Sequence, residues 1–228
     1  MKIVILAAGI GSRLGSPLPK PLTLLKDGKS IMEHQIGNLL TSFSIHDISV
    51  VVGFKKDLIM EAFPELTYIY NQHFDQTNTS QSLLKALRKY SDQGVLWLNG
   101  DVVFDGQILE TLLPHIRENR SFVCVNREKV GEEEVKYTVD DQQHIKELSK
   151  SVSNALGEAV GINYISSGHI NAFIGCLEKC GLQDYFEKGL ELAISTHGIA
   201  IHPVDISEFN CMEVDFKDDL NRANAFIQ

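Results

Sequence analysis

The sequence predicts an α/β protein in which a mostly parallel sheet is flanked by helices. Short apolar, β-branched runs at 2–5 and 48–52 have the length and composition of buried strands. Between them, segment 30–40 places its apolar residues at a helical spacing. Strands that alternate with helices in this way form a parallel sheet connected by right-handed crossovers.

The elements expected farther along the chain continue this alternation. Ser30 is the expected N-cap of the first helix, because its hydroxyl can accept a backbone N–H of the first turn. Further helices are expected at 57–63, from residue 82, at 107–117, at 183–194 and after residue 216. Further strands are expected at 66–70, 94–104 and 121–126, in a hairpin of 137–140 with 144–148, within 157–165 and near 211–215.

The bulk composition is that of an ordinary globular chain. It has 228 residues, of which 43% are hydrophobic and 22% are charged. The net charge of −9 argues against a nucleic acid or an anionic membrane as a partner. We expect a cytoplasmic protein, because the sequence has no long apolar run and its N-terminus enters a strand directly instead of a signal peptide.

The stretch after the first strand carries the most specific chemistry. Residues 6–14 spell LAAGIGSRL, and Pro-Lys-Pro follows at 19–21. Small residues and glycines let a backbone turn sharply and present successive N–H groups to an anion. Arg13 adds a planar fork suited to phosphate oxygens and Lys20 adds a compact charge, so we expect a cradle for a nucleoside triphosphate. Its expected nucleotide contacts are Leu6, Ala7, Ala8, Gly9, Gly11 and Ser12.

Two other phosphate-binding loops do not fit this stretch. A Walker A loop needs Gly, four residues and then Gly-Lys-Ser/Thr, and no such run occurs. The dinucleotide fingerprint needs a third glycine, where this sequence has Leu14.

A second informative stretch is the apolar strand that ends in Asn99-Gly100-Asp101. Ligands of open α/β sheets bind at the carboxyl ends of the strands, where Asp101 would lie. An ionised carboxylate there needs a partner, and a divalent cation beside a triphosphate would serve. A simple turn is the alternative, since Gly-Asp is common in turns.

Together, these motifs closely resemble those of a nucleotidyltransferase family that includes sugar-1-phosphate nucleotidyltransferases and small CTP-dependent cytidylyltransferases. The resemblance extends over essentially the whole chain. It implies one Rossmann-like domain over 1–228, with a small antiparallel insertion on the acceptor side at 127–165. It also implies that Asp101 binds Mg²⁺ and that Asp215, in the terminal Glu-Val-Asp motif, is the second ligand.

The same resemblance implies positions for the two substrates. Thr79, Ser80 and Ser82, with Gly100, would lie beside the nucleotide, although the polar loop before the helix needs only one of these hydroxyls as an N-cap. The residues implied for the acceptor are Lys150 for its phosphate, Glu158 facing it, and Tyr185 and Glu187, near Phe186 and Glu191, for an ammonium group. From the residues alone, Lys150 could equally be a surface lysine, and the aromatic side chains could belong to the core.

The activity implied is transfer of CMP from CTP to a small phosphorylated or phosphonate acceptor, with Arg13 and Lys20 as the catalytic residues, Mg²⁺ as cofactor and pyrophosphate as product. Acceptors of this class include phosphocholine, aminoethylphosphonate and phosphorylated amines or amides such as phosphoglutamine. A sugar-1-phosphate nucleotidyltransferase using UTP, dTTP or GTP is the alternative, and a non-catalytic nucleotide sensor is the alternative from another class. The base, the acceptor and the assembly, including a homodimer, stay open.

Overall fold

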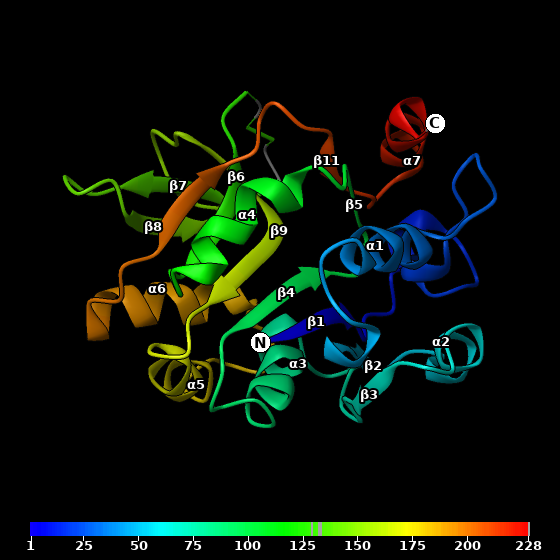
Figure 1. Cartoon of the computed structure of the whole chain (residues 1–228), viewed down its shortest axis with the longest axis horizontal. Coiled ribbons are helices and arrows are strands. Elements are labelled where there is room, and N and C mark those ends of the chain that lie inside the picture. The colour runs from blue at the N-terminus through cyan, green and yellow to red at the C-terminus, as the bar shows by residue number, and fades with distance from the viewer. Residues whose placement is uncertain (129, 132–133, 228) are drawn as a thin grey trace.

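The computed structural model describes residues 1–128, 130–131 and 134–227. A twisted central sheet runs through the molecule with helices on both faces (Figure 1). Its main strands follow the order β10-β6-β9-β4-β1-β2-β3. Their bounds are β1 Lys2–Ala7, β2 Ile48–Val52, β3 Thr67–Tyr70, β4 Val95–Asn99, β6 Phe122–Asn126, β9 Gly157–Ile165 and β10 His202–Asp205.

The pairing confirms a mostly parallel sheet. Strand β1 lies between β2 and β4 and is parallel to both, β2 is parallel to β3, and β10 is parallel to β6. Strand β9 is antiparallel to both of its neighbours, β4 and β6. We expected 157–165 at the end of an insertion, whereas this segment runs through the middle of the main sheet.

Both faces of the sheet are buried, which explains the continuous apolar runs of the sequence. Ile3 and Ile5 of β1 face one core, and Val4 and Leu6 face the other. The first core is covered by α1 Ile31–Leu40, α2 Lys56–Ala62 and α4 Ile108–Arg117. The second core is covered by α3 Thr79–Leu87, α5 Ile170–Leu177 and α6 Phe186–His197. None of the helices in the described ranges is long and apolar enough to cross a membrane.

Two small antiparallel units and three short turns of 3-10 helix complete the fold. The predicted hairpin is formed by β7 Lys136–Val139 and β8 Ile145–Ser149, and β7 also pairs with β9. A separate two-stranded sheet joins β5 Val102–Phe104 to β11 Cys211–Glu213, next to α7 Lys217–Phe226. The 3-10 turns are Ser12–Leu14, Lys20–Leu22 and Ile45–Asp47.

The helix starts show where local prediction succeeds and where it fails. Ser30 caps α1 as predicted, in a capping box with Glu33. Helix α3 starts at Thr79 instead of Ser82, because the Asn78 side chain accepts the Thr79 N–H at 2.8 Å and caps the helix three residues earlier. Thr79 and Ser80 therefore belong to the first helical turn.

A histidine cluster beside β10 predicts a specific acid sensitivity. The His202 ring lies 4.7 Å from that of His144 and 6.5 Å from that of His115, measured between centroids. Burial, together with His144, Arg120 and His115, lowers the pKa of His202. Below the unfolded-state pKa of about 6.5, His202 becomes protonated in the unfolded chain but stays neutral in the folded chain until the pH falls further. Acid therefore lowers the free energy of unfolding.

We expect His202→Gln to reduce the loss of unfolding free energy between pH 7.5 and pH 5.5, measured by urea denaturation. His46→Gln is the matched control, because His46 is exposed on a 3-10 turn. If the His202 variant loses as much stability as the wild type on acidification, the histidine cluster does not cause the sensitivity.

Candidate active site

A cleft of about 1030 Å³ opens at the carboxyl ends of β1 and β4. One side of the cleft is lined by the loop after β1, including Gly9 and Gly11, and by the turn at Gly100. Close backbone packing holds that turn, since the Gly100 N–H donates to the Leu6 carbonyl at 2.9 Å and a Cβ at residue 100 would lie 2.8 Å from the same oxygen. The cleft thus lies where ligands bind in open α/β sheets.

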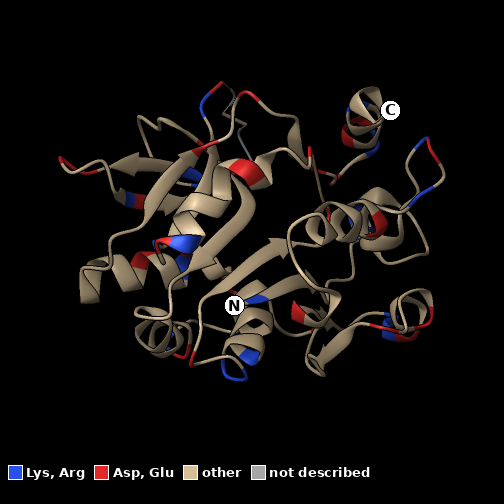
Figure 2. Cartoon of the chain, viewed as in Figure 1, with Lys and Arg blue, Asp and Glu red and all other residues tan. Residues whose placement is uncertain are grey.

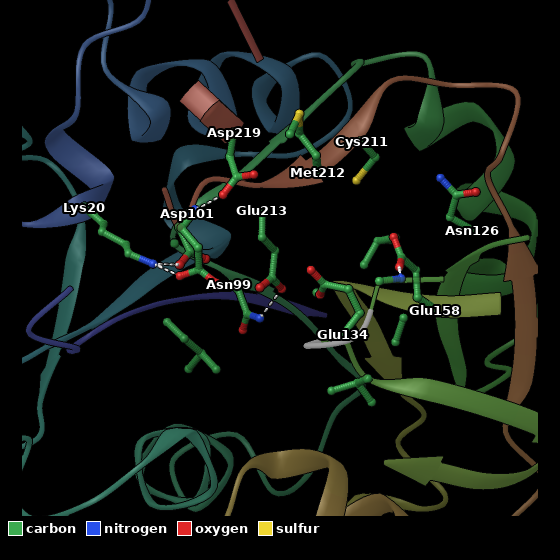
Figure 3. Close-up of a pocket in the computed structure, with 18 of the residues that line it drawn as sticks. Lys20, Asn99, Asp101, Asn126, Glu134, Glu158, Cys211, Met212, Glu213 and Asp219 are labelled. Atoms are coloured by element: carbon green, nitrogen blue, oxygen red, sulfur yellow. Dashed lines mark hydrogen bonds and ion pairs between the residues drawn. The ribbon is translucent and has the colours of Figure 1, made fainter. Parts of the chain in front are cut away.

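Lys20 is the centre of the charged network in this cleft. Its Nζ lies 3.0 Å from Asp101 Oδ2 (Figure 3). The same Nζ also donates to Asp215 Oδ1. Lys20 belongs to a 3-10 turn, whereas Asp101 follows β4 and Asp215 follows β11. Gly11 makes room for it: its φ is +64°, and a Cβ at residue 11 would lie 2.7 Å from Lys20 Cγ. The fold therefore joins three distant segments at one ammonium group.

Arg13 extends the network toward the mouth of the cleft. Its Nη1 lies 3.4 Å from Asp215 Oδ2, and its guanidinium lies 5.9 Å from the centre of the Phe216 ring. Asp219 accepts the N–H groups of Asp215 and Phe216, at 3.0 and 2.7 Å, so the first turn of α7 orients this segment. Both cations expected to be catalytic and both expected metal ligands thus meet at one place.

The Lys20 ammonium is stabilised in its charged form. Burial alone would lower its pKa, but the Asp101 and Asp215 carboxylates outweigh burial and raise it. Lys20 is therefore protonated at neutral pH and neutralises part of the acidic charge around it.

The Asp101–Asp215 pair has the donor chemistry that Mg²⁺ requires. Mg²⁺ is usually bound by one or two carboxylates, together with water and substrate phosphates, instead of a complete protein cage. Asp101 and Asp215 fit this pattern because both reach the same ammonium group. Among the residues that the structure describes, no group of three or more His, Cys, Asp or Glu forms a metal cage.

The predicted nucleotide contacts divide into residues that line the cleft and residues that do not. Leu6, Ala7, Gly9, Gly11, Thr79 and Gly100 line it. Contrary to our expectation, Ser80 and Ser82 are buried outside its lining, and the Ser82 hydroxyl accepts from Asn71 Nδ2 at 3.0 Å. The early start of α3 turns both serines inward. Ala8 is also buried outside the lining, and the side chain of Ser12 is outside the described part of the chain.

The four expected acceptor residues all line the same cleft: Lys150, Glu158, Tyr185 and Glu187. The Lys150 Nζ lies 5.6 Å from the centre of the Tyr185 ring. Glu158 Oε2 accepts the Gly131 N–H at 2.9 Å. Glu191, which we expected near the same group, is outside the lining and lies 3.4 Å from Lys188 Nζ.

Glu187 is the most perturbed of the four. Its Oε2 is buried and has no hydrogen-bond partner among the described residues. Burial raises the pKa of Glu187 to about 7, although Lys150 acts in the opposite direction.

The sequence alone indicates no role for Glu213, and its acidic run at 132–134 indicates only a positively charged group on the acceptor. Both Glu213 and Glu134 line the cleft. Glu213 Oε1 accepts from Asn99 Nδ2 at 2.8 Å, and burial and the charge of Asp101 raise the pKa of Glu213. Burial and the neighbouring Glu158 raise that of Glu134. Glu213 could have been found from strand periodicity, since it precedes Asp215 by two positions, but Glu134 lies in a charged run with no periodic pattern.

Comparison with known proteins identifies the family. Residues 3–166 match the model of the MobA-like NTP transferase domain. The chain belongs to this family. The match confirms the resemblance to nucleotidyltransferases that the sequence motifs indicated.

The curated relatives of this MobA-like domain are much longer than the segment that matches. CMP-5'-(3-aminopropyl)phosphonate synthase of Streptomyces rubellomurinus is 37% identical over 121 residues, covering 49% of this chain and 19% of the relative. Bifunctional protein GlmU of Francisella tularensis subsp. novicida is 35% identical over 116 residues, covering 50% of this chain and 25% of the relative. The alignments thus span a fifth to a quarter of these relatives.

Solved structures confirm the fold of this MobA-like domain. The inositol-1-phosphate CTP transferase from T. maritima has a TM-score of 0.80 at 15% identity, covering 100% of this chain and 97% of that one. CTP:phosphocholine cytidylyltransferase from Streptococcus pneumoniae has a TM-score of 0.75 at 16% identity, covering 100% and 99%. UDP-glucose pyrophosphorylase has a TM-score of 0.78 at 11% identity, covering 98% and 97%.

Proposed function

We propose that this MobA-like NTP transferase domain is a cytidylyltransferase that transfers CMP from CTP to a small phosphorylated or phosphonate acceptor. The observation that carries the proposal is the network in which Lys20 and Arg13 meet Asp101 and Asp215 below the glycine-rich loop. A nucleotide sensor needs charges to hold phosphates, but it does not need two carboxylates and a part-buried ammonium group at the point of transfer. The name of the Streptomyces relative supports CMP as the transferred group.

The reaction needs no protein nucleophile. An oxygen of the acceptor's phosphate or phosphonate attacks the α-phosphorus of CTP in line. The bond from the α-phosphorus to the α–β bridging oxygen breaks, and pyrophosphate leaves with that oxygen. The protein contributes positioning and preorganised charge. Lys20 would neutralise charge that develops at the α-phosphate, and the exposed end of Arg13 would hold the β- and γ-phosphates.

Asp101 and Asp215 would hold Mg²⁺, which neutralises phosphate oxygens when it is bound. Both carboxylates contact Lys20, so the lysine orients them before substrates arrive. On the nucleotide side, Thr79 and the backbone at Gly100 would contact the nucleoside. On the other side, Lys150 would bind the acceptor's phosphate, near Tyr185 and the surrounding glutamates.

A sugar-1-phosphate nucleotidyltransferase using UTP, dTTP or GTP is the second candidate. The shared fold with UDP-glucose pyrophosphorylase supports this alternative. In that reaction Lys20 and Arg13 would still bind the phosphates, and Asp101 and Asp215 would still hold Mg²⁺. Only the contacts to the base and to the acceptor would differ.

Pyrophosphate release tests both candidates. Each of the four ribonucleoside triphosphates and dTTP is combined with Mg²⁺ and with phosphocholine, aminoethylphosphonate, phosphorylated amides or sugar-1-phosphates. Release with CTP and a small amine or amide acceptor is expected. Release only with a sugar-1-phosphate would replace the first candidate by the second, and nucleotide binding without release in any combination would contradict both.

A further inference from the structure

We infer that Gln35 is a positioning residue for the proposed reaction, because its side chain holds the turn that carries Asp101. Gln35 lies on α1, is 1% exposed and is outside the lining of the cleft. It would therefore act on the reaction only through the residues that it contacts. The inference rests on the proposed function and adds to it a residue behind one of the expected metal ligands.

The Gln35 side chain bridges the two ends of this turn. Its Nε2 donates to the carbonyl of Asn99, the last residue of β4, and to the carbonyl of Val102, the first residue of β5, each at 2.8 Å. Gly100 and Asp101 are the two residues between these carbonyls. One amide group thus uses both of its N–H donors to hold the two ends of the turn together.

The turn needs such a clamp because the chain leaves the central sheet at this point. Strand β4 pairs with β1 and β9, whereas β5 pairs with β11 in the separate two-stranded sheet. The regular ladder is interrupted at a junction of this kind, and a buried carbonyl there needs a donor from another element. Helix α1 supplies that donor through Gln35.

The two carbonyls also decide how the Gln35 amide is oriented. Carbonyl oxygens only accept hydrogen bonds, so the nitrogen of the side chain must face them and the oxygen must face away. The Oε1 of Gln35 is buried and has no hydrogen-bond partner among the described residues, which costs free energy. An apolar side chain would avoid this cost, but it would leave both carbonyls of the turn without their amide donor.

The clamped turn is connected to the segment that carries the second expected metal ligand. The Asp101 carbonyl accepts the Val214 N–H at 3.0 Å. Asn99 Nδ2 donates to Glu213 Oε1 at 2.8 Å (Figure 3). Val214 directly precedes Asp215, so the turn helps to set the position of this carboxylate as well.

The position of these carboxylates matters because Mg²⁺ demands near-ideal geometry from its oxygen ligands. Residues that orient a metal ligand from behind typically change metal affinity or activity by about 10- to 100-fold when they are replaced. Loss of the Gln35 N–H donors should therefore weaken metal binding, although Gln35 lies outside the cleft.

The test replaces Gln35 by methionine, an unbranched side chain of similar size without N–H donors. Electron paramagnetic resonance measures the affinity of the full chain for Mn²⁺, used as a probe in place of Mg²⁺, without nucleotide. We expect Gln35→Met to weaken Mn²⁺ binding about tenfold or more. Gln35→Asn keeps an amide on a shorter side chain and should weaken binding by a smaller factor, and it serves as the test if the methionine variant does not fold.

Asn38→Leu is the matched control, since Asn38 lies one turn farther along α1 and makes the same kind of hydrogen bond. Its Nδ2 donates to the Phe104 carbonyl at 2.8 Å, at the other end of β5. Urea denaturation should show that Asn38→Leu and Gln35→Met both lower the free energy of unfolding. Only Gln35→Met should weaken Mn²⁺ binding.

Asp101→Asn shows where the effect arises. Acidic residues are spread over the chain (Figure 2), so only the Mn²⁺ binding that this variant reduces belongs to the turn. If Gln35 acts through Asp101, Gln35→Met should lower kcat for pyrophosphate release about tenfold in the wild-type background and should have little further effect in the Asp101→Asn background. Equal factors in the two backgrounds would indicate a structural role that is independent of Asp101.

Three results would overturn the inference: unchanged Mn²⁺ binding in the Gln35 variants, equal weakening in Asn38→Leu, or wild-type binding that Asp101→Asn does not reduce. Pyrophosphate release separates this outcome from that of the proposed function. Weakened Mn²⁺ binding without release from any nucleotide would support the role of Gln35 and reject the transferase. Release at the wild-type rate in Gln35→Met would retain the transferase and reject the positioning role.

Discussion

Lys20→Ala is expected to lower kcat by about two orders of magnitude or more, with the fold intact, by analogy with the removal of one transition-state donor. The Lys20 ammonium is part-buried and contacts both Asp101 and Asp215. No other described lysine or arginine contacts both of these carboxylates, so none can replace its charge. The fold should survive because Lys20 contributes a charge at the cleft surface and is not part of the apolar cores.

The measurement is kcat for pyrophosphate release, together with the thermal unfolding midpoint. Lys56→Ala is the matched control, since Lys56 pairs with the exposed Asp57 on α2 and lies outside the cleft. An unfolding midpoint near that of the wild type combined with normal turnover would remove Lys20 from the mechanism.

The second large effect is expected from Asp101→Asn, which should lower kcat by about two to three orders of magnitude. The substitution keeps the size of the side chain but removes the charge that would hold Mg²⁺. It also removes one of the two ion pairs of Lys20. We expect the remaining activity to require a higher Mg²⁺ concentration than the wild type does.

Titration of kcat against Mg²⁺ concentration measures both effects. Asp105→Asn provides the control, because Asp105 also follows a strand, β5, but lies outside the cleft and accepts the Gln107 N–H. A variant at residue 101 with the kcat and the Mg²⁺ dependence of the wild type would show that Asp101 is not a metal ligand.

Both predictions concern residues that could be found in the sequence, because each residue belongs to a short motif next to a strand. Lys20 lies in a short motif after an apolar strand, and Asp101 follows the end of another strand. Parallel strands place their carboxyl ends at one edge of the sheet, so the fold class alone brings both segments near each other. The family match over residues 3–166 agrees with that argument.

Other parts of the site depend on contacts that no local pattern contains. Asn78 caps α3, so Ser80 and Ser82 lie in the helix and are buried, although the cap was expected from a hydroxyl of the same segment. The antiparallel place of β9 follows from its pairing with β4 and β6, which precede it in the chain by tens of residues. Pairing of this kind is decided by packing and burial in the complete sheet.

The sequence by itself determined the alternating strands and helices, the glycine-rich loop after the first strand, and the selection of Lys20 and Asp101 as candidate site residues, because each depends on the chemistry of neighbouring residues. Only the tertiary structure decided that Asp215 meets Lys20 and that four glutamates converge across the cleft. Burial raises the pKa of Glu134, Glu187 and Glu213, and neighbouring carboxylates add to the effect at Glu134 and Glu213. Both causes depend on which distant segments the fold brings together.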